Sequence, residues 1–208
     1  MKERWAQEWS KKPFKVEILL SAAVTLTILY LFSNYLEFNE ARTTVVDIHD
    51  PVPALFSPKD VTLITGVLIY VGAVAAISNL VMNPTHLVLL FKAYGLLIAF
   101  RLVAMFLLPL SPPENMIVLT DPLAEFVASQ AKPLEKDLFF SGHTATMMLF
   151  ALVTRGWRIK LFFWVATAIM AVLVVSQHVH YTIDVYMAPF VCFTAYSIAT
   201  MIGMHRKK

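Results

Sequence analysis

Charged residues are scarce in this 208-residue chain, where they make up 15% against 58% hydrophobic residues. Soluble globular domains carry about a quarter charged residues, so the composition argues against a soluble protein. The six glycines follow no repeat period, which excludes a collagen-like chain. The single cysteine, Cys192, lies in an apolar run, and this excludes both a disulfide framework and a cysteine-based metal site.

The sequence instead contains long apolar runs. We predict six membrane-spanning helices at about residues 16–36, 61–81, 87–108, 138–154, 161–178 and 181–204. A helix needs about 20 residues to cross the hydrocarbon core, so six spans use most of the chain and leave only short connections. We therefore expect a single all-α membrane domain over residues 1–208.

Lysine and arginine are distributed unevenly among the connections. Eleven of them lie in the amino-terminal segment, in the connection between the fourth and fifth runs, and in the tail, whereas loops 37–60 and 109–137 hold four. Because cytoplasmic loops carry the excess of basic residues, the pattern predicts both termini in the cytoplasm. Loops 37–60 and 109–137 and the turn at 178–180 then share the non-cytoplasmic face.

Two polar segments lie at that predicted face. Residues 137–144 read DLFFSGHT, and residues 176–184 read SQHVHYTID. Ionisable groups at membrane depth are costly, so they are functional candidates by default. His180 and Asp184 are four residues apart and share one face of a helix. A carboxylate in that position orients the imidazole and stabilises its cationic form.

Two histidines with one carboxylate suit phosphoryl transfer through a phosphohistidine. One neutral imidazole attacks phosphorus, and the other, His143, protonates the departing oxygen. Ser141, Gly142 and the backbone amides that open the fourth helix supply hydrogen-bond donors for the phosphate. This chemistry needs no cofactor and no metal. Within the third run, we interpret Arg101 as an anion partner and Lys92 as an interfacial anchor.

Two other interpretations of the same residues stay open. His143, His178, His180 and Asp184 have the chemistry to bind zinc or non-haem iron. The His180–Asp184 pair also suits a structural role that holds two helices together.

The stretch Ser-Gly-His-Thr, followed about 40 residues later by His-Tyr-Thr-Ile-Asp, resembles the paired motifs of the type 2 phosphatidic acid phosphatase (PAP2) superfamily. The resemblance is closest to the sphingomyelin synthase-like branch. In that branch an acidic residue precedes the motif histidine by six positions, as Asp137 does here, and an arginine lies in the third span, as Arg101 does. Glu125 is a gapped match to a further acidic residue of the branch.

The resemblance implies a PAP2-like bundle of six helices with its active site on the non-cytoplasmic face. It also implies His180 as nucleophile, Asp184 as its partner and His143 as general acid. The chain departs from the phosphatase branch at Phe140, where that branch usually has proline, and at Val174, where it has arginine. These departures favour the synthase-like branch.

We therefore predict a membrane lipid phosphotransferase that moves a phospholipid headgroup phosphate to a lipid hydroxyl, that of ceramide or diacylglycerol, or to water. The first alternative is a phosphatase of phosphatidic acid, phosphatidylglycerol phosphate or a polyprenyl diphosphate. The second is a non-catalytic lipid carrier or transporter. The expected partners are bilayer lipids and not nucleic acid.

The short chain favours a bacterial inner membrane with a periplasmic site, and a Golgi or endoplasmic reticulum membrane with a luminal site is topologically equivalent.

Overall fold

The computed structural model describes residues 2–120 and 134–204. Within these ranges the chain is helical, with the elements α1 (Lys2–Trp9), α2 (Lys12–Ala41), the 3₁₀ turn η1 (Pro53–Leu55), α3 (Thr62–Val81), α4 (Pro84–Leu107), α6 (Gly142–Val153), α7 (Trp157–Ser176) and α8 (Thr182–Met204). The extended pairing found in the described ranges is one isolated bridge between Val46 and Leu110. Glu125 lies outside the described residues.

Five of these helices, α2, α3, α4, α7 and α8, are long and apolar enough to cross a membrane. They correspond to five of the six predicted runs, so the expectation of an all-helical membrane protein is confirmed. The fourth run is not confirmed as a span. Its helix, α6, has 12 residues because it begins at Gly142 and not at Leu138. Twelve residues rise about 18 Å, well short of the roughly 30 Å hydrocarbon core.

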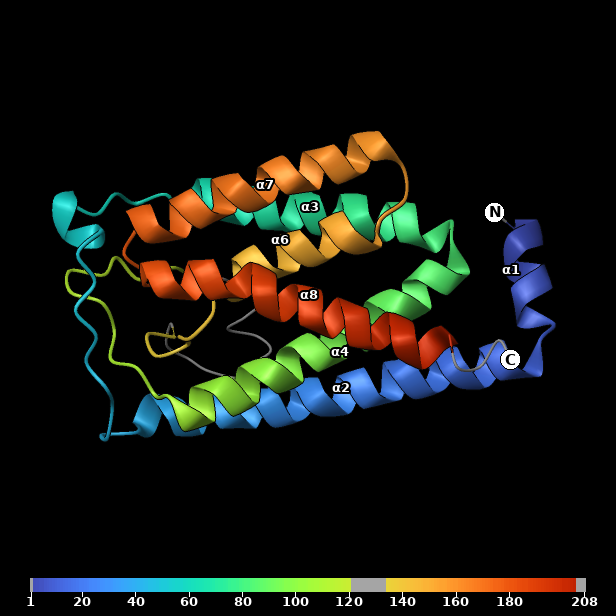
Figure 1. Cartoon of the computed structure of the whole chain (residues 1–208), viewed down its shortest axis with the longest axis horizontal. Helices are drawn as coiled ribbons and strands as arrows, with labels where there is room; N and C mark the ends of the chain where they lie inside the picture. Colours follow the sequence, from blue (N-terminus) through green and yellow to red (C-terminus); the bar gives the residue numbers. More distant parts are fainter. Residues whose placement is uncertain (1, 121–133, 205–208) are drawn as a thin grey trace.

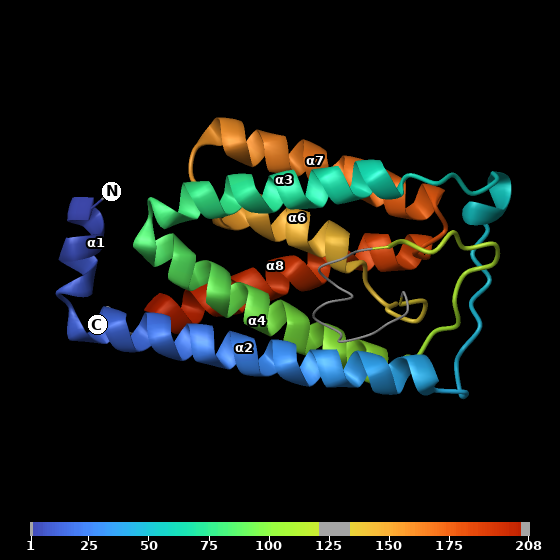
Figure 2. The same cartoon turned by 180° about the vertical axis from the view of Figure 1, so that it is seen from behind.

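The helices α2, α3, α4, α6, α7 and α8 alternate in direction along one bundle (Figure 1 and Figure 2). Loops 42–61 and 108–120 and the turn 177–181 gather at one end, which we call the loop end. The connections 82–83 and 154–156 lie at the other end together with α1, which runs across the bundle axis, and with the carboxyl end of α8 (Figure 1). We call this the α1 end.

Helix α6 is the most enclosed element of the bundle. It lies between α3 and α7 on one side and α4 and α8 on the other (Figure 1), and eight of its 12 residues are buried. Non-helical backbone at membrane depth is tolerated where protein surrounds it. This enclosure explains how a helix too short to cross the hydrocarbon core, with an irregular segment before it, can lie at the centre of the bundle.

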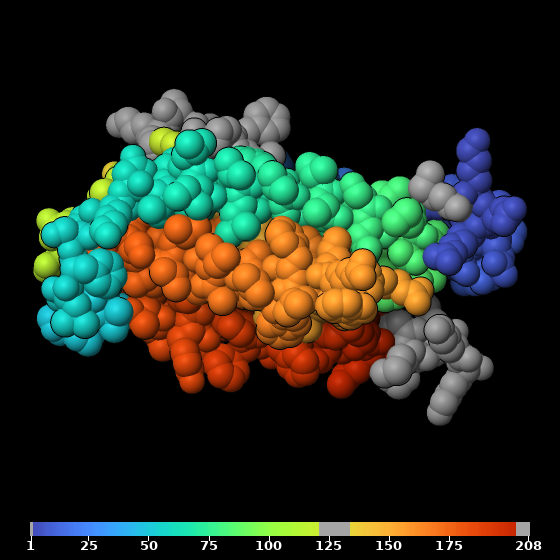
Figure 3. Space-filling view, turned by 90° about the horizontal axis from the view of Figure 1, so that it is seen from above, coloured from blue at the N-terminus to red at the C-terminus, as the bar shows by residue number. Residues whose placement is uncertain are grey.

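The outer faces of the bundle carry large exposed apolar side chains. Leu63 on α3 is 79% exposed and Val172 on α7 is 64% exposed, and these two helices run side by side along one face (Figure 3). Soluble monomers rarely expose extended apolar surface, whereas a helix facing lipid does so along its length. The distribution supports a multi-pass membrane protein.

Candidate functional site

His180 and Asp184 form a buried pair where α8 begins. Their side chains are almost fully enclosed, with 2% and 0% of the residues exposed, and His180 Nδ1 lies 3.2 Å from Asp184 Oδ2. An ionised carboxylate only accepts hydrogen bonds, so Nδ1 is the ring nitrogen that carries the proton. The Nε2 of a neutral ring then holds its lone pair for attack. Asp184 Oδ2 also accepts the Tyr181 N–H at 3.3 Å, which fixes the carboxylate against the turn.

The two polar segments are joined through their backbones. The Ser141 N–H donates to the Asp184 carbonyl at 3.1 Å. Ser141 also caps α6, because its Oγ accepts the Thr144 N–H at 3.3 Å. His143 follows in the first turn of α6 and is half-buried. The amides of a first helical turn have no intrahelical acceptor, and the helix dipole is positive there. The loop end therefore combines the His180–Asp184 pair with the anion-attracting end of α6.

Arg101 and Asp137 make a second ion pair beside α6, in which the arginine is buried and the aspartate is partly exposed. Arg101 is 3% exposed. Its Nη2 lies 2.8 Å and its Nε 3.2 Å from Asp137 Oδ1, and its guanidinium carbon lies 6.0 Å and 5.7 Å from the ring centroids of Phe32 and Phe140. The two rings and the carboxylate together hold the group in a single orientation.

The remaining nitrogen of Arg101, Nη1, is buried and has no hydrogen-bond partner among the described residues. A Cβ atom built on Gly142 would lie 2.2 Å from this nitrogen. Glycine is therefore what lets the guanidinium lie against the start of α6. A buried donor without an acceptor costs free energy, so Nη1 is suited to an anionic ligand.

Sequence reasoning missed two residues that hold the turn between α7 and α8. Gln177 is 1% exposed; its Oε1 accepts the Val61 N–H at 3.2 Å, and its Nε2 donates to Thr62 Oγ1 at 2.8 Å. Asp50 Oδ2 accepts the Thr182 N–H at the start of α8. Gln177 ties the turn to the start of α3, and Asp50 ties the first outer loop to the start of α8. The signal in the sequence was a glutamine, Gln177, at the end of a long apolar run.

His178 is held by loops and not by the carboxylate of Asp184. Its Nδ1 lies 3.1 Å from the Glu114 carbonyl oxygen, and its ring packs edge-on against Phe56 with 5.4 Å between ring centroids. Its φ of 57° places the backbone in the left-handed region. Within residues 2–120 and 134–204, no group of three or more His, Cys, Asp or Glu side chains is arranged to hold a metal ion.

Three carboxylates act electrostatically on Tyr181 in the turn. Burial raises the pKa of the Tyr181 phenol, and the charges of Asp184, Asp47 and Asp50 raise it further, against the lowering effect of its hydrogen bond to the Ser111 carbonyl. Arg101 is the single buried Lys or Arg among the described residues, and Asp137 neutralises it. The site is therefore not strongly electropositive.

Both polar segments fall within the part of the chain that resembles known proteins. Residues 136–201 match the family model described as PAP2 superfamily C-terminal. The match supports a place in the PAP2 superfamily. Members of that superfamily are phosphatases, which supports an enzyme that acts on lipid phosphates. The match does not separate the sphingomyelin synthase-like branch from the others. No curated protein matches the chain.

Proposed function

We propose that this protein is a membrane-embedded lipid phosphotransferase in which His180 forms a covalent phosphoenzyme. One observation carries the proposal. The buried hydrogen bond between His180 and Asp184 lies at the point where the Ser141–Asp184 backbone contact brings in the start of α6. A nucleophile, its orienting acid and an anion-binding helix end thus come together in a protein whose outer surface suits lipid.

The reaction has two steps that share one histidine pair. In the first, His180 Nε2 bonds to the phosphorus of a phospholipid, the bond between phosphorus and the diacylglycerol oxygen breaks, and His143 gives that oxygen a proton. In the second, an acceptor hydroxyl loses its proton to His143 and bonds to phosphorus, which releases His180. Asp184 stabilises the positive imidazole in both steps.

Arg101 and the first turn of α6 suit the phosphate oxygens. The unpartnered Nη1 of Arg101 donates to one oxygen, and the amides that follow Ser141 face another. Asp137 has a positioning role, since it fixes the other two guanidinium nitrogens. This arrangement offers fixed donors where negative charge develops in the transition state.

The charge of the site favours a phosphodiester over a phosphomonoester. A monoester carries about −1.5 to −2 charges at neutral pH, whereas a diester carries one. Arg101 is already paired, and Asp184 and Asp50 lie close to the reacting histidine. A second negative charge on the substrate would be repelled, so we favour a headgroup phosphodiester as donor and the sphingomyelin synthase-like reaction, with ceramide or diacylglycerol as acceptor.

We also propose that the loop end faces the periplasm or the lumen. The support is the excess of lysine and arginine in the connections of the opposite end.

The test follows a labelled headgroup. Purified protein in vesicles receives headgroup-labelled phosphatidylcholine or phosphatidylethanolamine, with and without ceramide or diacylglycerol. We expect the label to move to the lipid acceptor, and we expect His180→Gln to abolish the transfer. His86→Gln is the matched control, because His86 bonds the Val153 carbonyl at the α1 end of the bundle. Release of label only to water would leave a lipid phosphohydrolase, and absence of both transfer and release in the wild type would leave a carrier. Undiminished transfer by His180→Gln would overturn the assignment of His180 as nucleophile.

A further inference from the structure

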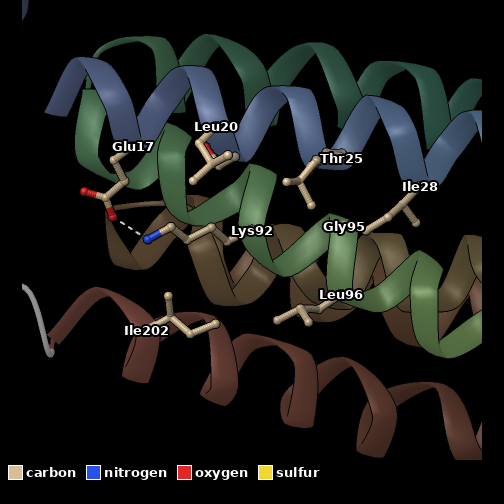
Figure 4. A pocket seen from close by; sticks show the side chains of 10 residues that line it. Glu17, Leu20, Thr25, Ile28, Lys92, Gly95, Leu96 and Ile202 are labelled. Atoms are coloured by element: carbon tan, nitrogen blue, oxygen red, sulfur yellow. Dashed lines mark hydrogen bonds and ion pairs between the residues drawn. The ribbon is translucent and has the colours of Figure 1, made fainter. Parts of the chain in front are cut away.

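A groove runs along α2, α4 and α8 in the half of the bundle near α1 (Figure 4). Its volume is about 260 Å³. Leu20 and Ile28 of α2, Leu96 of α4 and Ile202 of α8 form apolar walls. The groove lies away from His180, at the opposite end of the bundle, and the proposed transfer reaction makes no use of it.

Close packing of α2 against α4 forms the floor of the groove. Thr25 Oγ1 of α2 donates to the Phe91 carbonyl of α4 at 2.7 Å. A Cβ atom on Gly95 would lie 2.8 Å from the same Oγ1, so glycine is needed for this approach. Small residues that let helix backbones meet are the usual basis of packing in membranes. The floor is therefore a fixed part of the fold.

An ion pair closes the groove at the α1 end. Lys92 of α4 donates to Glu17 of α2, and the two side chains are 14% and 22% exposed. Figure 4 shows both side chains at the same end of the apolar walls. Lys92, which the sequence suggested as an interfacial anchor, is thus paired with a carboxylate. Charged groups within spanning helices are costly and mark functional sites by default.

We propose that the groove binds one phosphatidylethanolamine molecule from the leaflet at the α1 end. An acyl chain lies along the leucine and isoleucine walls, and the headgroup meets the ion pair. An ammonium group has three N–H donors, so Lys92 can bind a phosphate oxygen as well as Glu17. The Glu17 carboxylate has lone pairs enough to accept from Lys92 and from the ethanolamine ammonium. A choline headgroup has no N–H to donate, and a glycerol headgroup has no positive charge.

The test measures lipid retention by native mass spectrometry. The protein in detergent receives equal amounts of phosphatidylethanolamine, phosphatidylcholine and phosphatidylglycerol with identical acyl chains. We expect one tightly held phosphatidylethanolamine on the wild type. Glu17→Gln keeps the shape of the side chain but removes its charge, so we expect about tenfold weaker binding of phosphatidylethanolamine and no preference over phosphatidylcholine.

A matched pair of tryptophan variants tests the groove itself. Leu20→Trp fills the groove and should abolish retention, whereas Leu26→Trp, on an exposed part of α2 outside the groove, should leave retention unchanged. Ile202→Trp fills the groove from α8 and replaces Leu20→Trp if that variant does not fold. Equal binding of the three lipids by the wild type, or equal retention by the filled and control variants, would overturn the proposal. Headgroup transfer is measured separately, so its failure leaves this result unaffected.

Discussion

The Ser141 N–H donates a 3.1 Å hydrogen bond to the carbonyl of Asp184. Ser141 is the residue that caps α6, and Asp184 is the residue that holds His180. The bond therefore links the anion-attracting end of one helix directly to the proposed nucleophile, His180, and its carboxylate partner. The two segments, about 40 residues apart in sequence, are thus held together. Moving the start of either helix would disturb both the cap of α6 and the His180–Asp184 pair.

Asp184→Asn should remove most of the transfer activity without unfolding the protein. Asparagine keeps the size of the side chain but cannot stabilise an imidazolium by charge. In a comparable nucleophile–base–acid arrangement this change lowers kcat about 10⁴-fold, and we expect a loss of about 10³-fold or more here. Initial rates of headgroup transfer give kcat and KM, and thermal unfolding checks the fold. Asp47→Asn, on an exposed carboxylate at the same end, should keep activity. Retention of more than a tenth of kcat by Asp184→Asn would contradict the assigned role.

Gly142→Ala should displace Arg101. The added methyl would lie 2.2 Å from Nη1, closer than any real contact, so the guanidinium must move. Alanine is a better helix former than glycine, so α6 itself is not weakened by the change. We expect kcat/KM to fall about 100-fold, equivalent to the loss of one charge-assisted contact with the phosphate.

Two comparisons make the Gly142 result specific. Gly66→Ala on α3 is the control, since its nearest new neighbour is Tyr70 at 4.0 Å. In the background of Arg101→Met, Gly142→Ala should cost little more, because the group it displaces is already gone. Additive losses in the double variant would show that the two residues act separately.

Apolar runs predicted the long helices well because burial in lipid depends on local composition. The run at 61–81 corresponds to α3 at Thr62–Val81, and the run at 161–178 to α7 at Trp157–Ser176. Helix α2 extends from Lys12 to Ala41, beyond its predicted bounds of 16–36, because polar residues continue the helix past the apolar stretch. The length of α6 was not predictable, since it depends on the four helices that enclose it.

The candidate site was predictable where its contacts are local in sequence. His180 and Asp184 are four residues apart, so helix geometry alone pairs them. Gln177 bonds Val61 across 116 positions, and Asp50 bonds Thr182 across 132. No spacing rule indicates such contacts. Arg101 was expected as an anion partner, but its pairing with Asp137 and its contact with Gly142 required the fold.

Phe140→Pro should damage the segment before α6 far more than Phe140→Ala does. Phe139 and Phe140 have φ values of 59° and 36°. Proline fixes φ near −65° and pushes the preceding residue into extended conformations, so neither residue could keep its backbone. Both variants lose the buried ring, and the difference between them reports the backbone alone. We expect proline to cost at least about 2 kcal/mol more and to abolish transfer, as measured by thermal unfolding and initial rates. Equal stability of the two variants would contradict this.

Vanadate should inhibit the enzyme, and a chelator should not. Vanadate adopts the five-coordinate geometry that phosphorus passes through when a histidine attacks it. Within the described residues the histidines and carboxylates form no metal-binding group, and His178 bonds a backbone carbonyl instead. Transfer rates with and without each reagent give the answer. Loss of activity on chelation, restored by zinc or iron, would favour the metal interpretation.

Asp50→Ala should loosen the start of α8, and Asp50→Asn should loosen it less. Asp50 Oδ2 accepts the Thr182 N–H and Oδ1 accepts the Val52 N–H at 3.0 Å, so the side chain joins the first outer loop to the helix that carries Asp184. Asparagine retains one oxygen acceptor, which can serve the Thr182 N–H while its amide nitrogen faces the Val52 N–H, whereas alanine retains no acceptor. Loss of a helix-capping acceptor costs about 1 kcal/mol, and we expect a matching fall in the free energy of unfolding for Asp50→Ala. Transfer should decline with it, because His180 lies two residues before Thr182. If alanine and asparagine behaved alike, the charge of Asp50 and not its hydrogen bonds would be what the turn requires.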